Sequence, residues 1–171
     1  FDAALDEEQQ MKEGKYKKAE KYYDSIFEGI ETESLPLPDL TGKTPKKGYL
    51  ERKLNIAEKA ILACCEKTGV TPNILFTGLF GILLTKYSNS SDSLFATIYN
   101  GRNDSRLENT VCMLVKTLPV YCSFDTKTTI QAYMAALSEQ VLSSMANDIF
   151  PFSDICAKYG FNSDIVFAYQ A

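Results

Sequence analysis

The chain of 171 residues contains no histidine. It therefore has no imidazole for a Ser-His-Asp or Cys-His triad, for a His-ligated zinc site, or for general-base catalysis. It also lacks tryptophan, which excludes nothing. Any chemistry that this chain performs must use carboxylates, Lys, Tyr, Cys or backbone dipoles, or must draw its catalytic groups from another chain.

Paired cysteines are also missing, because the five cysteines include no C-x-x-C pair. Structural zinc sites use spaced pairs of ligands, so we predict no metal ligands. Cys64 and Cys65 are adjacent and lie within an apolar helical pattern. We interpret all five as reduced, buried thiols of a cytosolic protein.

The chain has little excess charge, with a net charge of −4 and a pI near 5.0. A weakly acidic protein is a poor candidate for binding nucleic acid or an anionic membrane. The acidic N-terminus does not resemble a signal peptide. The longest uncharged run, residues 69–85, is shorter than the roughly 20 residues of a membrane span and indicates a buried helix. We therefore expect a cytoplasmic protein without membrane contact.

Charge is concentrated at the N-terminal end, where residues 1–54 hold 22 of the 40 charged side chains. We interpret this part as solvated and peripheral, and acidic pairs such as Glu7-Glu8 as surface charge. Two helical stretches broken near Gly14 precede a Pro-rich extended segment and a loop. The sequence thus predicts a helical arm and crossing segment over 1–47, and an α/β lobe over 48–171.

The lobe alternates strand and helix patterns in the order β-α-α-β-β-α-α-β, which predicts a mixed sheet covered by helices. The Asn55–Glu58 capping box begins one helix, and Thr71 with Pro72 begins the next, which is apolar nearly all round. Pro119 places its strand at an edge or a bulge. Strands are predicted over 49–54, 94–99, 111–124 and 164–169, and helices over 55–68, 71–87, from 128 to about 145, and 151–158.

Five segments carry a resemblance to a known family. The first is Lys21-Tyr-Tyr-Asp24 before the Leu-Pro-rich crossing, and the second is the apolar helix 70–87, which ends in a Tyr. Residues 94–103 end in Asn-Gly-Arg-Asn, residues 111–120 resemble I-G-x-F-V-N-T-x-P-x, and residues 147–152 resemble H-Q-D-x-P-F. In this order they resemble the C-terminal half of a nonribosomal peptide synthetase condensation domain.

The resemblance implies one lobe of a chloramphenicol acetyltransferase-like fold, in which two α/β lobes form a V around a tunnel. Carrier proteins deliver thioesters on phosphopantetheine arms, and an amine attacks the thioester to form an amide. The family motif H-H-x-x-x-D-G lies in the N-terminal lobe. The chain thus resembles a tunnel wall and carrier-docking surface, inactive alone, without a directly bound cofactor or catalytic residue of its own. Its implied partners are the N-terminal lobe and carrier proteins.

The chain departs from the family pattern at three positions. Lys116 replaces the Asn of the V-N-T segment, Leu114 replaces an aromatic residue, and Asn147 replaces the His of H-Q-D-x-P-F. A Lys only donates hydrogen bonds and carries charge, so it does not replace an amide. Either this member handles a different substrate or its parent domain is degenerate, and the sequence leaves both open.

The resemblance and the strand ends together predict the candidate site. The predicted tunnel residues are Tyr99, Asn100, Leu114, Lys116 and Thr117, although Lys116 could equally point to solvent. The predicted interlobe loop residues are Arg102, Asn103 and Arg106, and the alternative is a solvated cluster compensated by Asp104 and Glu108. Pro151 and Phe152 are predicted to be structural, with the Pro starting a helix and the Phe anchoring it in the core.

Two hypotheses on function remain open. The first is an acyl-transfer half-domain whose catalytic group comes from a missing lobe. The second is a non-catalytic module of the same fold that binds a carrier protein or another partner. Since the last predicted strand reaches almost to Ala171, we expect the domain to be truncated here and to expose an apolar face where its other lobe packs.

Overall fold

The computed structural model describes residues 2–30, 47–102, 104–125, 127–161 and 164–170. The predicted Pro-rich crossing and most of the loop after it lie outside these residues. The helices are α1 (Asp2–Lys12), α2 (Lys15–Phe27), α3 (Glu58–Thr68), α4 (Pro72–Ser88), α5 (Ile130–Ala146) and α6 (Phe152–Tyr159), with a short 3-10 turn at Ser105–Leu107. The strands are β1 (Asp92–Tyr99), β2 (Lys116–Ser123) and β3 (Val166–Phe167).

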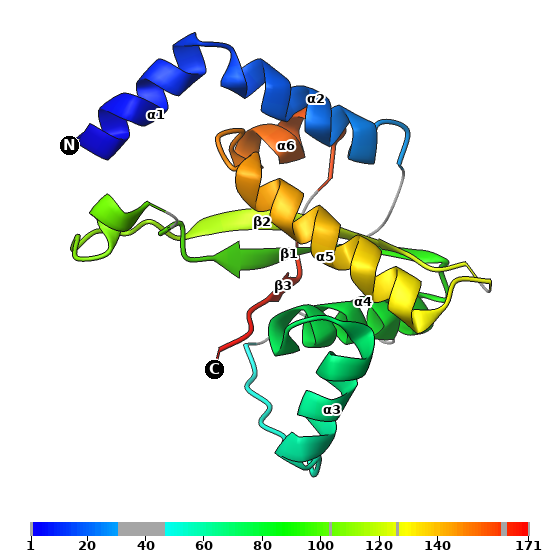
Figure 1. The fold of residues 1–171 in the computed structure, drawn as a ribbon. Coiled ribbons are helices and arrows are strands. Elements are labelled where there is room, and N and C mark those ends of the chain that lie inside the picture. Colours follow the sequence, from blue (N-terminus) through cyan, green and yellow to red (C-terminus); the bar gives the residue numbers. More distant parts are fainter. Residues whose placement is uncertain (1, 31–46, 103, 126, 162–163, 171) are drawn as a thin grey trace.

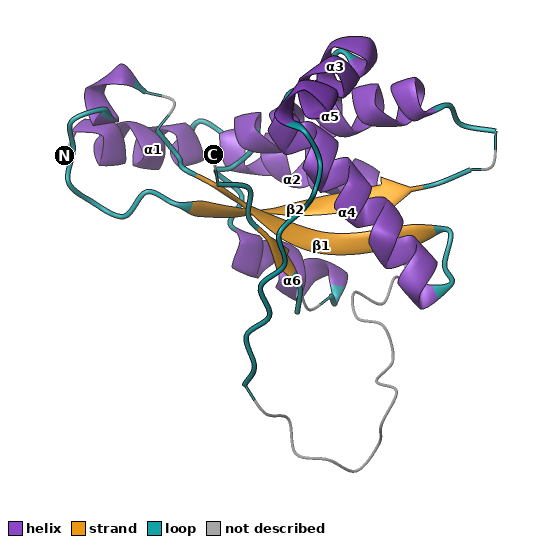
Figure 2. Ribbon diagram, turned by 90° about the horizontal axis from the view of Figure 1, so that it is seen from below, coloured by secondary structure: helices purple, strands orange, loops and turns teal. Residues whose placement is uncertain are grey.

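The strands form a mixed sheet in the order β2-β1-β3 (Figures 1 and 2). β1 and β2 are antiparallel, with Phe95 opposite Val120, and β3 lies parallel to β1. The predicted mixed α/β fold is therefore confirmed. β2 lies at the edge of this sheet, where Pro119 costs no hydrogen bond to a further strand.

Alternate residues of β1 supply two separate cores, because successive strand side chains point to opposite faces. Phe95 packs with α3, α4 and α5, whereas Leu94 packs with α2 and α6. Figure 1 shows α2 and α6 on one side of the sheet, and α3 and α4 on the other. Gly81 lets α4 approach β2 closely, since a Cβ there would lie 2.5 Å from Cys122 Sγ.

The N-terminal segment is not wholly peripheral, in contrast to the interpretation from charge. Ala19, Tyr23 and Phe27 follow a helical spacing along one face of α2 and are all buried. The charges lie on other faces of this helix, where Lys158 of α6 pairs with Glu20 and Asp24 at 2.7 Å. The dense charge at this end of the chain reflects the outer face of a packed helix.

The predicted strand 49–54 and the helix start that follows it are wrong. Residues 47–57 form neither a strand nor a helix, and Tyr49 is 89% exposed. Local sequence makes a strand only where a partner strand pairs with it, and none does so here among the described residues. The Asn55–Glu58 capping box does not form, because α3 begins after Ala57 without a side-chain cap.

Four further boundaries or faces differ from the prediction. β2 begins at Lys116 instead of residue 111, because β1 ends opposite Lys116 and offers no partner to residues 111–115. β3 is two residues long, and α5 is capped by Thr129, not Thr128. One side of α4 is not packed, since Leu83 is 52% exposed and Leu79 and Tyr87 lie on the same side.

The thiols differ in their surroundings, so the prediction that all are buried is wrong. Cys65 and Cys122 are buried and Cys156 is half-buried, whereas Cys64 and Cys112 are exposed. In α3, the helix turns Cys65 inward and leaves Cys64 in solvent.

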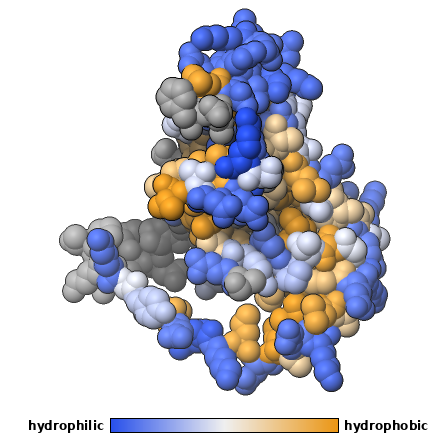
Figure 3. Space-filling view, turned by 60° about the vertical axis from the view of Figure 1, so that its left-hand side comes forward, coloured by the Kyte–Doolittle hydropathy of each residue, from blue (hydrophilic) through white to orange (hydrophobic). Residues whose placement is uncertain are grey.

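Apolar side chains reach the surface at several places, in patches among hydrophilic regions on the face drawn in Figure 3. Within the described residues, no single helix is long and apolar enough to cross a membrane. Only α3 and α4 taken together meet that criterion, and they are bent by 88°.

Candidate functional site

The end of the β1–β2 ladder gathers the predicted tunnel residues. Tyr99, the last residue of β1, pairs with Lys116, the first of β2, and Thr117 pairs with the residue before Tyr99. Tyr99 is buried, Lys116, Thr117 and Leu114 are half-buried, and Asn100 is exposed. The five predicted residues therefore lie within one small region, although they differ in accessibility.

Gly101 makes the turn out of β1 possible. Its φ of +65° is unfavourable for residues with a side chain. A Cβ at this position would also overlap the carbonyl oxygen of Leu114. The backbone of residue 101 and that of residue 114 therefore pack directly against each other, which places Leu114 beside the end of β1.

Arg102 organises the loop that follows. Its guanidinium donates hydrogen bonds to three backbone carbonyls, those of Leu107 at 2.6 Å, Thr110 at 3.0 Å and Cys112 at 3.1 Å. These bonds join the start of the loop to its end, just before β2 begins. Asn103, the next predicted loop residue, lies outside the described residues.

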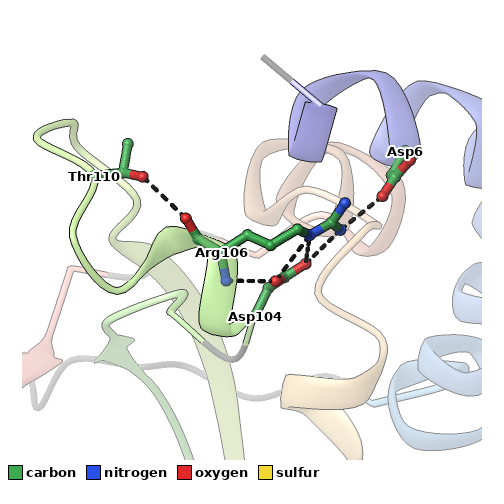
Figure 4. Close-up of polar contacts among 4 residues, drawn as sticks. All are labelled: Asp6, Asp104, Arg106 and Thr110. Atoms are coloured by element: carbon green, nitrogen blue, oxygen red, sulfur yellow. Dashed lines mark hydrogen bonds and ion pairs between the residues drawn. The ribbon is translucent and has the colours of Figure 1, made fainter.

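Arg106 connects the loop to the N-terminal helix (Figure 4). Its guanidinium pairs with Asp104 and with Asp6 of α1, the latter at 2.6 Å. Asp104 also accepts the backbone N–H of Arg106 at 2.9 Å, so it caps the 3-10 turn. These bonds from Arg106 lower the pKa of Asp104 to about 2. The charge of Arg106 is thus compensated within the chain, and its pair with Asp6 connects the loop to α1.

Lys116 joins three separate segments. Its ammonium lies 3.0 Å from Glu7 Oε1 of α1 and 3.3 Å from Asp148 Oδ1 in the turn between α5 and α6. The Lys116 side chain is 32% exposed and that of Asp148 is 23% exposed. The segment 111–120 therefore contacts the segment 147–152, so the two motif-like segments meet at one ion pair.

Burial and the ion pairs act in opposite directions on the two pKa values. Burial lowers the pKa of Lys116, but the hydrogen bond to Glu7 and the charge of Asp148 outweigh it, and the net shift is upward. Burial raises the pKa of Asp148, and Lys116 offsets this only in part. Lys116 is therefore the group that stabilises the charged form of the Asp148 carboxylate.

The remaining motif residues support the turn between α5 and α6. Asn147 ends α5, and its Nδ2 donates to the carbonyl of Ser143 at 2.8 Å. Pro151 directly precedes the first residue of α6, as predicted. Phe152 is only half-buried, whereas Ile155 is 1% exposed and provides the main anchor of α6.

A cavity of about 300 Å³ adjoins this turn. It lies between the α1–α2 junction and the α5–α6 turn, and is lined by Gln10, Lys15, Lys18, Ala146, Asn147, Asp148 and Ile149. Sequence reasoning did not find this cavity. The place of Asp148 in the motif-like segment could have predicted that it lies at the site. Nothing in the sequence distinguishes Glu7, Lys15 or Lys18 from other surface charges. The described residues contain no group of three or more potential metal ligands.

Comparisons with known proteins agree on one family. The family model described as "Condensation domain" matches residues 3–170. Gramicidin S synthase 2 of Brevibacillus brevis is 24% identical over 155 residues, which cover 88% of this chain and 4% of that protein. The chain thus spans a small part of such relatives.

Solved structures show the same fold. The first condensation domain of the calcium-dependent antibiotic synthetase, in complex with a substrate analogue, matches with a TM-score of 0.72 at 15% identity. The match covers 96% of this chain and 36% of that one. A complex of the X-domain and OxyB from teicoplanin biosynthesis matches with a TM-score of 0.67 at 17% identity, over 94% and 37% of the two chains.

Proposed function

Because this chain belongs to the condensation domain family, we propose that it forms part of a nonribosomal peptide synthetase domain that makes amide bonds. In this reaction the amine nitrogen of one carrier-bound substrate attacks the thioester carbon of another. The C–N bond forms, the C–S bond breaks, and the sulfur of the phosphopantetheine arm leaves as a thiolate, which takes up the proton that the amine loses. The chain contributes a wall of the substrate tunnel and a surface for carrier docking.

The observation that carries the proposal is the family match, which extends over residues 3–170. The contact between Lys116 and Asp148 supports it, because it joins the two motif-like segments at one place. In this proposal Tyr99, Asn100, Leu114, Lys116 and Thr117 face the tunnel. The loop that contains Arg102, Asn103 and Arg106 faces the other lobe of the domain.

Proton transfer is assigned to the H-H-x-x-x-D-G motif that the resemblance implies for the other lobe, since this chain has no histidine of its own. The partners in the proposal are the N-terminal lobe of the same domain and two carrier proteins. Phosphopantetheine enters as the arm of a carrier and is not a resident cofactor. The proposal places the reaction in the cytoplasm.

The test uses the whole polypeptide that contains this chain, with one carrier protein loaded as donor and one as acceptor. The proposal expects an amide-linked product, detected by mass spectrometry on the acceptor carrier. It also expects the sequence preceding Phe1 to contain two adjacent histidines followed by x-x-x-Asp-Gly. Absence of product with every loaded pair tested, together with absence of that motif, would refute the catalytic assignment.

The alternative is a module of the same fold that binds a carrier or another protein without chemistry. Two observations favour it: Lys116 stands where the family motif has Asn, and it is engaged by Glu7 and Asp148. The matched X-domain structure is a complex with another protein, OxyB, so this fold can serve as a binding partner. Stable binding of an unloaded carrier by a whole protein that forms no amide would favour this alternative.

A further inference from the structure

The helix α1 has no hydrophobic anchor over residues 5–12. No side chain in this range is buried, and Leu5 and Met11 are 48% and 42% exposed. In contrast, Tyr23 and Phe27 anchor α2 in a core to which residues 5–12 contribute nothing. The two successive helices are therefore held in place by different means.

Two ion pairs connect α1 to the end of the β1–β2 ladder. Asp6 pairs with Arg106 of the loop at 2.6 Å, and Glu7 pairs with Lys116 of β2 at 3.0 Å. Figures 1 and 2 show α1 at the end of the sheet from which this loop extends. The other side-chain hydrogen bonds of residues 5–12 stay within the same segment of chain. The polar contacts that hold α1 against β2 and the loop are thus ion pairs.

Gly14 separates the two helices and leaves room for a change in their relative orientation. Its φ is +83°, and a Cβ at this position would meet no atom within 4 Å. The Gly14 N–H donates to the carbonyl of Met11 at 3.2 Å, and the Gly14 carbonyl accepts from Lys18 at 3.1 Å. The cavity of about 300 Å³ adjoins this junction. Rotation about Gly14 therefore moves α1 without displacing a buried side chain of α1.

The two ion pairs are of the kind that salt weakens. The side chains of Asp6 and Glu7 are both 48% exposed, and that of Arg106 is 53% exposed. Charges at the surface are screened as the Debye length falls from about 10 Å at 0.1 M salt to about 3 Å at 1 M. Isolated helices shorter than about 12–15 residues are marginal in water. Since α1 has 11 residues, it should also lose helical structure when the pairs break.

We propose that α1 is a strap, held across the end of the β1–β2 ladder by its ion pairs to Arg106 and Lys116, and that it opens about Gly14. In the closed state the Lys116 ammonium faces both Glu7 and Asp148, whereas in the open state Asp148 alone remains. Because an ammonium has three N–H donors, opening makes Lys116 available to another acceptor. The use of this lysine by a tunnel substrate rests on the proposed function, but the motion of the strap does not.

The experiment measures hydrogen exchange by mass spectrometry in the whole polypeptide that contains this chain. It compares peptides over residues 6–12 with peptides over residues 16–27, at low (about 0.05 M) and high (about 1 M) salt. We expect exchange of residues 6–12 to become about three- to tenfold faster at high salt, because both pairs are weakened. Exchange of residues 16–27 should change by less than about twofold, since buried side chains hold α2.

Matched variants separate the strap from a general effect of salt. Arg106→Gln removes one pair from outside α1 and leaves both the sequence of α1 and the ion pairs of Lys116 unchanged. At low salt it should accelerate exchange of residues 6–12 by about three- to fivefold. The control Lys158→Gln also removes a cation that pairs with two carboxylates, but these belong to α2. It should leave exchange of residues 6–12 within about 1.5-fold of the wild type.

A second measurement follows the acylation of individual lysines by an N-hydroxysuccinimide ester at low salt. Arg106→Gln touches neither ion pair of Lys116, so it changes the reactivity of this lysine only by moving α1. We expect Lys116 to be acylated about three- to fivefold faster in Arg106→Gln than in the wild type. The control Lys158→Gln should leave the acylation rate of Lys116 unchanged.

Three results would overturn the proposal. Exchange of residues 6–12 that neither salt nor Arg106→Gln accelerates refutes the strap. Equal acceleration in Lys158→Gln refutes the ion pairs at the end of the ladder as its cause. Faster exchange with unchanged acylation of Lys116 refutes the release of this lysine. Neither measurement uses amide formation, so a negative result here leaves the proposed function standing, and absence of amide product leaves the strap standing.

Discussion

The contact between Lys116 and Asp148 can be tested by removing the lysine charge. In the variant Lys116→Met, the Asp148 carboxylate keeps its burial and loses the ammonium that lies 3.3 Å away. Exposed ion pairs contribute about 0–1 kcal/mol, and breaking a fully buried pair costs about 3–5 kcal/mol. Since both side chains are partly exposed, we expect the free energy of unfolding at pH 7 to fall by roughly 1–2 kcal/mol.

The loss should depend on pH in a defined direction. Burial already raises the pKa of Asp148, and removing Lys116 raises it further. A carboxyl whose pKa is raised by folding favours the folded state at low pH, and this contribution is lost as the pH rises through the folded-state pKa. The difference between wild type and Lys116→Met should therefore be largest near neutral pH and should shrink as Asp148 becomes protonated.

The assay is urea denaturation of four proteins between pH 4 and pH 8. These are the wild type, Lys116→Met, Asp148→Asn and the double variant. Asp148→Asn removes the unpaired charge, so the double variant should recover part of the stability lost in Lys116→Met. Additive losses, or a loss in Lys116→Met that does not change with pH, would show that the two side chains are not coupled.

Two other predictions concern packing and exposure. Gly81→Ala should lower the free energy of unfolding by about 1–3 kcal/mol in thermal or urea denaturation, because the new methyl group overlaps the Cys122 side chain. Gly48→Ala, which has open space around it, should change stability little, and equal effects would contradict the close packing. In alkylation followed by mass spectrometry, the exposed Cys64 and Cys112 should react well before Cys122, since burial raises the pKa of the Cys122 thiol to about 11. Alkylation of Cys122 as fast as that of the exposed thiols would contradict its burial.

Local signals predicted several elements correctly because their causes are local. Thr71 and Pro72 start α4, and Gly69 ends the preceding helix in a left-handed conformation. Pro119 lies in an edge strand, as its missing N–H requires. Each of these features depends on one residue and its nearest neighbours along the chain.

The errors concern features that depend on distant partners. Residues 49–54 were predicted to be a strand, but no described strand pairs with them. The aromatic stripe of α2 predicts an amphipathic helix, but not that α6 and Phe150 cover it. The charge content of α2 fits a packed amphipathic helix and a peripheral arm equally well. Only the tertiary contacts distinguish these two possibilities.

The candidate site was predictable only in outline. Lys116 was a predicted site residue, and residues 147–152 were identified only as a motif-like segment; the structure brings Lys116 and Asp148 together. Glu7, Lys15 and Lys18 lie in a charged N-terminal segment whose sequence has no feature that relates it to residues more than 100 positions away. Their contacts with the site depend on how α1 and α2 fold back over the α5–α6 turn, which is a tertiary property.

The central claim is that this chain contributes a tunnel wall and a docking surface, while the imidazole that handles the proton lies elsewhere. The most direct measurement incubates the purified 171 residues with donor and acceptor carrier proteins, both loaded, and follows amide formation over time. The account predicts a rate equal to that of the loaded carriers alone. Amide formation clearly above that background, abolished by a substitution within these residues, would contradict it.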